Sequence, residues 1–278
     1  MPTVRQLLAE ARPLLAATPF GASTREARLL LGHVLGLSEG RVLARDEIAV
    51  PPEAERRFRD LLARRLTGEP VSYLTGEREF WGRPFQVDSR VLIPRPETEH
   101  IVEIVLGQRL PRDPWILDVG TGSGILAVTL ALEISGSHMV ATDLSPGALA
   151  VAARNARRLG AAVSWVNTDL TAGLDLSRFD LVVSNPPYVD RSEFPDISLE
   201  VLDFEPHLAL FPPGAGDALL ARLFSQCSGL RNGIPLAVEI GRGQLDAVRR
   251  HAGDSGLDVA EVREDYAGIP RTVLLRHR

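Results

Sequence analysis

The sequence contains a single cysteine and no lysine, and each of these absences excludes a kind of chemistry. With only Cys227, an intrachain disulfide and a cysteine-rich zinc site are both excluded, which favours a reducing compartment. All 31 residues counted as Lys or Arg are arginine, so a lysine nucleophile or Schiff base is excluded as well. The six histidines show no metal-ligand spacing, and we expect no metal site.

Long apolar runs and an excess of positive charge are also missing. No apolar stretch approaches the roughly 18 residues of a membrane-spanning helix. The chain starts with Arg5, Glu10 and Arg12 where a secretory signal would be apolar. We therefore expect a cytoplasmic protein that does not contact a membrane. The formal charge of −5 argues against a protein that holds nucleic acid mainly by neutralising phosphates, although it does not exclude a local basic groove.

The first 70 residues of this 278-residue chain are typical of a small helical bundle. We expect a helix near residues 3–17, a second that starts with a capping box at Ser23 and Glu26 and ends at Gly36, and a third between Pro51 and Gly68. The third helix carries five arginines that we interpret as a solvated face or as a contact for a partner: Arg56, Arg57, Arg59, Arg64 and Arg65. Over residues 71–96 the helical period disappears, and alternating aromatic, β-branched and turn-forming residues predict a hairpin-like connector.

Residues 97–278 predict an α/β domain. Six short apolar segments have the length of strands and are mostly separated by helix-length segments: WILDV, HMVATD, AVSWV, FDLVVS, PLAVEI and TVLLR. This alternation predicts a mostly parallel sheet covered by helices on both faces, as in a Rossmann-like domain. The helix after the second strand is expected to begin at an N-cap on Ser145 and to stop at Gly160. Cys227 is expected to be a small core residue.

A glycine-rich turn follows the first of these strands. Asp118 ends the strand, and the turn that leads into the next helix contains Gly120, Thr121, Gly122, Ser123 and Gly124. Glycines allow a tight turn and a close approach of the backbone to a ligand, although a ligand-free turn is the alternative. The second strand ends in Asp143, whose carboxylate can accept hydrogen bonds from a ribose diol, and Asp169 and Leu170 follow the third strand. Three strand ends therefore predict one adenosine site.

The spacing of the glycines distinguishes between adenosine cofactors. A nicotinamide dinucleotide fold expects G-x-G-x-x-G, whereas this turn has G-x-G-x-G behind an acidic residue and lacks a Walker lysine. The combination resembles the S-adenosylmethionine turn of the Rossmann-like methyltransferases.

The fourth strand leads directly into Asn185, Pro186, Pro187 and Tyr188, the most specific feature of the sequence. Proline fixes its own φ and restricts the residue before it, so this turn is stiff. Asn185 Oδ1 and the main-chain carbonyl of Pro186 are two acceptors that can hold both hydrogens of a planar NH₂ group. Such a grip orients the nitrogen toward a methyl group and stabilises the charge that develops on it. Tyr188 offers a flat face for an amide or a base, while a rigid loop without a catalytic role is the alternative.

These motifs carry a resemblance to a known family. NPPY after the fourth strand is similar to the motif of methyltransferases that act on planar NH₂ groups, including adenine- and cytosine-amino DNA enzymes and glutamine-amide protein enzymes. The chain as a whole resembles the release-factor glutamine methyltransferases of the HemK/PrmC family over nearly all of its length. The resemblance is carried by YLTGEREFWG, VLIPRPETE, DVGTGSG, NPPY, FEPHLALF and EIGRGQ.

The resemblance implies methylation of the side-chain amide nitrogen of the glutamine in the Gly-Gly-Gln motif of peptide-chain release factors, with S-adenosylmethionine as cofactor and S-adenosylhomocysteine as product. It implies cofactor contacts by Asp118, the turn from Gly120 to Gly124, Asp143, Asp169, Leu170 and Asn185. Asn185, Pro186, Pro187 and Tyr188 are expected to hold the glutamine, with Asn185, Pro186 and Tyr188 as the catalytic residues and Arg95, Pro96 and Glu97 beside the pocket. Family members often have an aromatic residue where Leu170 stands, so we expect weaker adenine stacking here.

The resemblance also implies that the N-terminal helices help to recognise the release factor. We expect a monomer without a direct nucleic-acid substrate. A DNA or RNA amino-methyltransferase is the first rival hypothesis, and the net acidity and the lack of an obvious target-recognition domain count against it. A methyltransferase for a ribosomal-protein glutamine is the second, and a non-catalytic binding module is the third.

Overall fold

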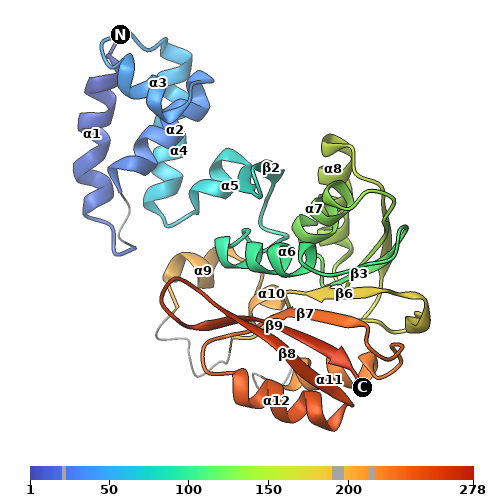
Figure 1. Ribbon diagram of the computed structural model, residues 1–278. Helices are drawn as coiled ribbons and strands as arrows, with labels where there is room; N and C mark the ends of the chain where they lie inside the picture. Colours follow the sequence, from blue (N-terminus) through green and yellow to red (C-terminus); the bar gives the residue numbers. More distant parts are fainter. Residues whose placement is uncertain (21–22, 190–196, 213–216) are drawn as a thin grey trace. The chain divides into compact units, whose positions relative to one another are not determined.

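The computed structural model describes residues 1–20, 23–189, 197–212 and 217–278 (Figure 1). The chain forms two compact units. One consists of Met1–Glu77 together with Asp196–Glu205, and the other of Arg78–Pro195 together with Pro206–Arg278. The helical unit thus extends beyond residue 70, where the sequence pattern places its end, and it includes a segment from the second half of the chain.

The helical unit contains α1 (Val4–Ala16), α2 (Thr24–Leu35), α3 (Glu39–Ala44), α4 (Pro52–Leu66), α5 (Val71–Thr75) and α9 (Leu199–Phe204). Apolar residues spaced three or four apart along α1, α2 and α4 form its core, in which Leu7, Leu30 and Phe58 are fully buried. Thr3 caps α1, because its side chain accepts from Gln6 N while the Gln6 side chain accepts from Thr3 N. The three predicted helices are present.

Three local predictions in this unit are wrong. The capping box at Ser23 does not form, because the Glu26 carboxylate instead accepts a hydrogen bond of 2.8 Å from Nε of Arg65. Arg65 itself is buried and does not belong to a solvated face. Residues 71–75 form the helix α5, which is too short to show a helical period and is bounded by Pro70 and by Gly76 in the left-handed region.

A hairpin of β1 (Glu77–Phe80) and β2 (Arg83–Gln86) follows. Its two turn residues, Trp81 and Gly82, have φ of 51° and 67°, as a two-residue type I′ turn requires. Phe80 and Phe85 are buried on either side of this turn, with an edge-to-face contact at 6.1 Å between ring centroids. Because they pack in the same cluster as residues of the sheet, the hairpin is anchored to the second unit.

The second unit is built on a seven-stranded sheet with the order β5-β4-β3-β6-β7-β9-β8. The strands are β3 (Trp115–Val119), β4 (His138–Asp143), β5 (Val163–Asn167), β6 (Leu181–Ser184), β7 (Pro235–Glu239), β8 (Leu257–Glu264) and β9 (Pro270–His277). Neighbours from β5 to β7 are parallel, whereas β9 is antiparallel to both β7 and β8. The predicted mostly parallel α/β sheet is confirmed. The sequence pattern missed β8, because charged residues interrupt its apolar alternation and it lies at the edge of the described sheet, next to β9.

Alternate residues of the sheet strands other than β8 enter two separate hydrophobic clusters. Ile116 packs with residues of α6 (Glu99–Leu106), α7 (Ile125–Glu133) and α8 (Pro146–Leu159), whereas the next residue, Leu117, packs with residues of α11 (Ala218–Cys227) and α12 (Leu245–Asp254). Figure 1 shows these two sets of helices on opposite sides of the sheet. Cys227 is buried in the second cluster, as expected of a small core residue. None of the described helices has both the length and the apolar character needed to cross a membrane.

Candidate active site

The sheet order creates a crevice where the chain changes direction. The chain runs from β3 outward to β4 and β5 and then returns to place β6 on the other side of β3. Val119 at the end of β3 therefore lies in register with Ser184 at the end of β6, and Ser184 Oγ donates a hydrogen bond of 2.8 Å to the carbonyl of Val119. Open α/β sheets bind ligands at such a switch point, beyond the carboxyl ends of the strands.

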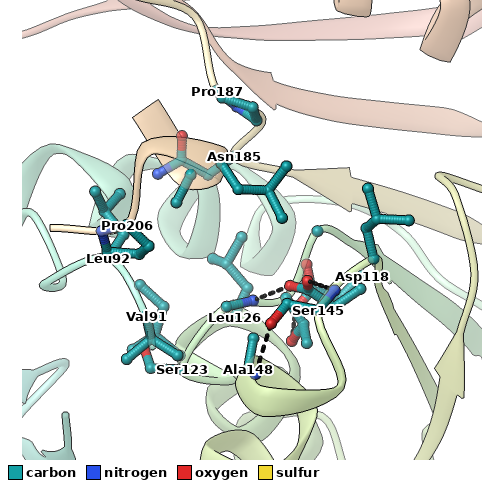
Figure 2. A pocket seen from close by; sticks show the side chains of 18 of the residues that line it. Val91, Leu92, Asp118, Ser123, Leu126, Ser145, Ala148, Asn185, Pro187 and Pro206 are labelled. Atoms are coloured by element: carbon teal, nitrogen blue, oxygen red, sulfur yellow. Dashed lines mark hydrogen bonds between the residues drawn. The ribbon is translucent and has the colours of Figure 1, made fainter. Parts of the chain in front are cut away.

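A pocket lies at this switch point (Figure 2). In the figure Asn185 and Pro187 lie on one side of it, opposite Ser123 and Ala148. Of the predicted site residues, the pocket is lined by Arg95, Asp118, Gly120, Thr121, Gly122, Ser123, Asp143, Asp169, Leu170, Asn185 and Pro187. The remaining predicted residues do not line it: Pro96, Glu97, Gly124, Pro186 and Tyr188.

The glycine turn takes a backbone course that other residues rarely adopt. Gly120, Gly122 and Gly124 have φ of 74°, 55° and 84°. A side chain on Gly124 would place its Cβ 2.9 Å from Cβ of Ala152 in α8. Gly124 therefore serves the close packing of α7 on α8, which explains why it does not line the pocket, whereas Gly120 and Gly122 present their backbone there.

Asp118 fixes this turn through hydrogen bonds from its buried side chain. It is fully buried, and its Oδ2 accepts hydrogen bonds of 2.6 Å from Thr121 Oγ1 and 3.1 Å from the backbone N–H of Ala127. Burial raises the pKa of Asp118 to about 7. Within the described ranges, Oδ1 of Asp118 has no hydrogen-bond partner. A buried acceptor that lines a pocket without a protein partner fits a site where a ligand supplies the donor.

Asp143 connects the turn to the next helix. Its Oδ2 accepts a hydrogen bond of 2.8 Å from the N–H of Gly122, and its Oδ1 accepts one of 2.8 Å from the N–H of Ser145. Burial raises the pKa of Asp143, although these backbone donors act in the opposite direction. Ser145 caps α8 as predicted, because its Oγ accepts from the N–H of Ala148. Each carboxylate oxygen keeps a second lone pair, so Asp143 can brace the turn and still accept from a ligand hydroxyl.

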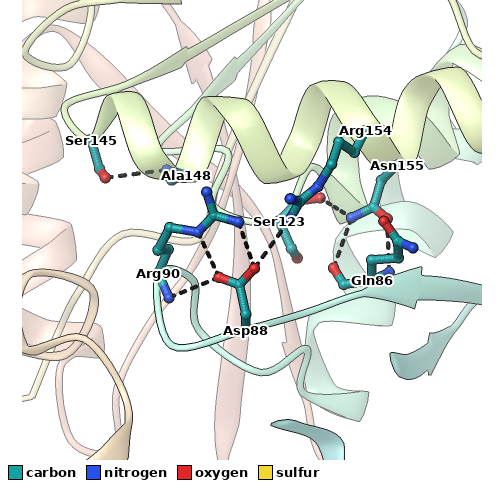
Figure 3. Close-up of polar contacts among 8 residues, drawn as sticks. All are labelled: Gln86, Asp88, Arg90, Ser123, Ser145, Ala148, Arg154 and Asn155. Atoms are coloured by element: carbon teal, nitrogen blue, oxygen red, sulfur yellow. Dashed lines mark hydrogen bonds and ion pairs between the residues drawn. The ribbon is translucent and has the colours of Figure 1, made fainter. Parts of the chain in front are cut away.

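Asn155 holds the outer side of the turn and the hairpin together (Figure 3). Its Nδ2 donates to the carbonyls of Ser123 and Gln86, at 2.8 and 3.0 Å, and its Oδ1 accepts from the N–H of Gln86 at 2.7 Å. Nearby, Asp88 accepts hydrogen bonds from Arg90 and Arg154, and the Arg90 side chain has the largest part in lowering the pKa of Asp88 to about 2. The connector is thus attached to α8 beside the pocket.

Asp169 and Leu170 lie on another part of the pocket lining. Asp169 forms an ion pair with Arg222 at 2.6 Å. Leu170 has a φ of 54°, which is unfavourable for a branched side chain. Such a conformation persists only where the surrounding structure imposes it. Here Leu170 packs against the hydrophobic cluster that contains residues of α11 and α12.

Asn185 belongs to a buried network that the sequence reasoning did not predict. Its Nδ2 donates a hydrogen bond of 3.0 Å to Oγ1 of Thr98, which donates one of 2.6 Å to Oε2 of Glu239. The hydroxyl of Tyr188 donates at 3.1 Å to Oε1 of the same carboxylate. Tyr188 therefore turns its hydroxyl toward the interior, while Asn185 lines the pocket. Thr98 and Glu239 lie in two of the motifs that carry the resemblance, PRPETE and EIGRGQ. Their place in these motifs is the sequence feature that could have identified them as site residues.

The network is buried enough to change the ionisation of its members. Thr98 is fully buried and Glu239 is 1% exposed. Burial raises the pKa of Glu239 to about 7, although the hydroxyls of Thr98 and Tyr188 act to lower it. Burial, followed by the charge of Glu239, also raises the pKa of the Tyr188 hydroxyl, which stays protonated as a donor.

Comparison with known proteins decides the family. The chain is 42% identical to a release factor glutamine methyltransferase of Cereibacter sphaeroides over 97% of this chain and 96% of that one. It is 44% identical to a release factor glutamine methyltransferase of Bordetella pertussis over 90% and 94%. The chain belongs to the release factor glutamine methyltransferase family. The family model of the PrmC N-terminal domain matches residues 6–76, and that of the methyltransferase small domain matches residues 103–203.

A solved structure agrees on the fold. The catalytic domain of hMettl16, in complex with hairpin 6 of the MAT2A 3′UTR, has a TM-score of 0.55 and 18% identity, covering 78% of this chain and 82% of that one. The predicted family and the Rossmann-like methyltransferase fold are therefore confirmed. This release factor glutamine methyltransferase family member is an S-adenosylmethionine-dependent enzyme, as predicted.

Proposed function

We propose that this chain methylates the side-chain amide nitrogen of the glutamine in the Gly-Gly-Gln motif of peptide-chain release factors. The observation that carries the proposal is the orientation of Asn185 in the pocket. Its Nδ2 donates to Thr98 inside the domain, which leaves Oδ1 as the end of the carboxamide available to a substrate. An acceptor beside a stiff NPPY turn is what recognition of an NH₂ group requires.

The glycine turn, Asp118, Asp143, Asp169 and Leu170 would hold the cofactor. Asp118 Oδ1, which has no partner among the residues that the structure describes, and the positive φ of the turn glycines fit a bound ligand at this place. When bound, the cofactor supplies an electrophilic methyl group on a sulfonium. We infer no further role for Gly124, whose lack of a side chain serves helix packing.

Asn185 and Pro186 have the central task in the reaction, because an amide nitrogen is a poor nucleophile. Its lone pair is delocalised into the neighbouring carbonyl. Asn185 Oδ1, from a residue that lines the pocket, would hold one N–H bond. The carbonyl of Pro186, a residue outside the pocket lining, remains the predicted acceptor for the other, and the two together would direct the lone pair at the methyl carbon. During methyl transfer the same acceptors would stabilise the positive charge that develops on the amide nitrogen, and they would hold its N–H bonds until one proton passes to solvent.

The surroundings of this pair have supporting tasks. Pro187 and Arg95 line the same pocket and would contact the substrate. Tyr188 contributes through its hydrogen bond to Glu239, while Pro96 and Glu97 remain predicted neighbours of the substrate. We propose that the helical unit recognises the release factor, that the enzyme acts as a monomer in the cytoplasm, and that nucleic acid is not its substrate.

Replacement of Asn185 tests the proposal. Single-turnover methyl transfer to purified release factor should fall by roughly 10² to 10³ in Asn185→Ala, the usual cost of losing one preorganised hydrogen-bonding group in a transition state. Affinity for S-adenosylmethionine, measured by calorimetry, should fall less, because the glycine turn and Asp143 remain. Asn232→Ala is the matched control, since Asn232 is exposed in the loop before β7.

Two outcomes would reject the proposal. Near-wild-type turnover of Asn185→Ala would remove the two-acceptor mechanism. Methyl transfer by the wild type to DNA or to ribosomal proteins, but not to the release factor, would assign the same site to another planar NH₂ group.

A further inference from the structure

Thr98 connects the catalytic turn to the interior of the domain. It ends the short helix η1 (Pro96–Thr98), and its side chain is fully buried. Its hydroxyl contacts Asn185 Nδ2 at 3.0 Å and Glu239 Oε2 at 2.6 Å. Thr98 also lines the pocket, so it lies directly between the substrate side and the buried carboxylate.

The direction of these hydrogen bonds follows from the number of protons available. In its ionised form the Glu239 carboxylate only accepts, so it then receives the hydroxyl protons of both Thr98 and Tyr188. A threonine hydroxyl has a single proton, and in Thr98 it is used toward Glu239. Toward Asn185 the hydroxyl can then only accept, which requires the Nδ2 end of the carboxamide. The Oδ1 end is consequently the one left for the substrate.

We propose that Thr98 and Glu239 are positioning residues for methyl transfer, which set the end of the Asn185 carboxamide that faces the substrate. The inference rests on the proposed function, because the reaction concerned is the methylation of an NH₂ group held by Asn185. The two ends of the carboxamide have nearly the same shape, so without this chain of donors and acceptors nothing would fix which end faces the substrate. A flipped Asn185 would present its own NH₂ to the NH₂ of the substrate, which is a repulsive arrangement.

The same carboxylate holds both ends of the NPPY turn. Through Thr98 it orients Asn185, and through the hydroxyl it holds Tyr188. The backbone of Tyr188 is held separately, because its carbonyl accepts from Nε2 of Gln244 at 3.0 Å. Burying a carboxylate is unfavourable, and a core without a polar network would pack as well with apolar residues. A role in placing donors and acceptors accounts for a buried glutamate at this position.

Isosteric variants separate this role from packing. Thr98→Val keeps the shape and removes the hydroxyl, whereas Thr98→Ser keeps the hydroxyl. Glu239→Gln keeps the shape but offers an amide donor to one of the two hydroxyls, which reverses the order of donors and acceptors. We expect Thr98→Val and Glu239→Gln to lower single-turnover methyl transfer roughly 10- to 100-fold, the scale of a misplaced reacting group, and Thr98→Ser to retain most activity. Cofactor affinity should stay within about twofold in all three, which also shows that they fold.

The decisive measurement repeats Thr98→Val in an Asn185→Ala background. If Thr98 acts through Asn185, the valine has no further effect once Asn185 is gone, and the two losses are not additive. An equal loss in both backgrounds would mean that Thr98 supports packing only and would overturn the inference, as would a Thr98→Ser variant as slow as Thr98→Val. Thr98→Ala takes the place of the valine variant if the latter does not fold.

A second readout does not depend on the identity of the substrate. The side-chain amide signal of Asn185 in a ¹⁵N-labelled protein can be assigned by its loss in Asn185→Ala. Its hydrogen exchange should be slow in the wild type and in Thr98→Ser, and fast in Thr98→Val. Unchanged exchange in Thr98→Val would overturn the inference, whereas a wild type that leaves release factor unmethylated would reject only the proposed function.

Discussion

Replacement of Asp143 by asparagine tests how the protein prepares its cofactor site. The two carboxylate oxygens accept hydrogen bonds of 2.8 Å from the backbone N–H groups of Gly122 and Ser145. Asparagine keeps one acceptor oxygen for one of these N–H groups. Its Nδ2 must then face the other N–H group, so that two hydrogen-bond donors point at each other. Loss of a hydrogen bond to a charged group costs about 1.5 to 3 kcal/mol. This cost disfavours the folded form of the turn that binds the cofactor.

The expected effect is a loss of cofactor affinity. A smaller fraction of binding-competent protein raises the apparent dissociation constant in proportion, and 1.4 kcal/mol corresponds to a factor of ten. We therefore expect Asp143→Asn to bind S-adenosylmethionine roughly ten- to a hundredfold more weakly in isothermal titration calorimetry. Asp246→Asn is the control, because Asp246 is exposed at the start of α12. A dissociation constant of Asp143→Asn within twofold of the wild type would refute the reasoning.

A cofactor analogue separates bracing of the turn from direct contact with the ribose. If Asp143 also accepts from a ribose hydroxyl, S-adenosylhomocysteine that lacks this hydroxyl binds more weakly to the wild type, and the difference disappears in Asp143→Asn. If the carboxylate only braces the turn, both proteins discriminate equally between the two ligands. The second result would leave the turn argument intact and would remove the ribose contact from the proposal.

Two further predictions concern buried charges. Arg65→Met should lower the free energy of unfolding of the helical unit by about 3 kcal/mol, because Glu26 and Glu200 would lose the buried guanidinium that pairs with both. Urea denaturation measures this loss, with Arg57→Met, a change at an exposed position, as the control. Equal stabilities of the two variants would contradict the prediction. Burial raises the pKa of Glu239 from 4.5 to about 7, with Glu97 acting in the same direction and Thr98, Tyr188 and Arg271 against it, so the folded state holds this proton more tightly than the unfolded state. The stability that this proton contributes is present below the unfolded pKa and is lost as the pH rises through about 7. The wild type should therefore lose roughly 3 kcal/mol of unfolding free energy relative to Glu239→Gln between pH 5 and 8. If urea denaturation gives the same difference between the two proteins at every pH, this prediction is wrong.

Much of the fold was predictable because its signals are local. Strand β3 and the turn after it were readable from a short apolar segment followed by alternating glycines, whose conformational freedom is a property of the residue itself. The helix α8 was readable for the same reason, since Ser145 and Gly160 act on the backbone next to them. The NPPY turn is the strongest case, because proline restricts its own residue and the one before it.

Predictions that depended on a side chain's choice of partner were less secure. The spacing of Ser23 and Glu26 predicts a capping box, yet Glu26 pairs with Arg65, which is 39 positions away in the chain. Arg65 in turn looks like part of an exposed arginine face, and only the tertiary structure shows that its pKa is held above the ordinary value: burial alone would lower it, but Glu26 and Glu200 outweigh that effect. Both errors have one cause, since a carboxylate or a guanidinium takes the partner that burial makes most favourable.

The network behind Asn185 shows why the chemistry of the site was only half predictable. Asn185 and Tyr188 stand in a recognisable turn, but their partners lie 87 and 51 positions away in the chain. Nothing in PRPETE or EIGRGQ distinguishes a threonine that orients an amide from one that caps a short helix. The parallel pairing of β6 with β7 determines the role of Thr98, because this pairing brings Glu239 at the end of β7 beside the segment that follows β6. The order of donors and acceptors at the NH₂ site is thus a property of the sheet, whereas the turn that presents it is a property of the local sequence.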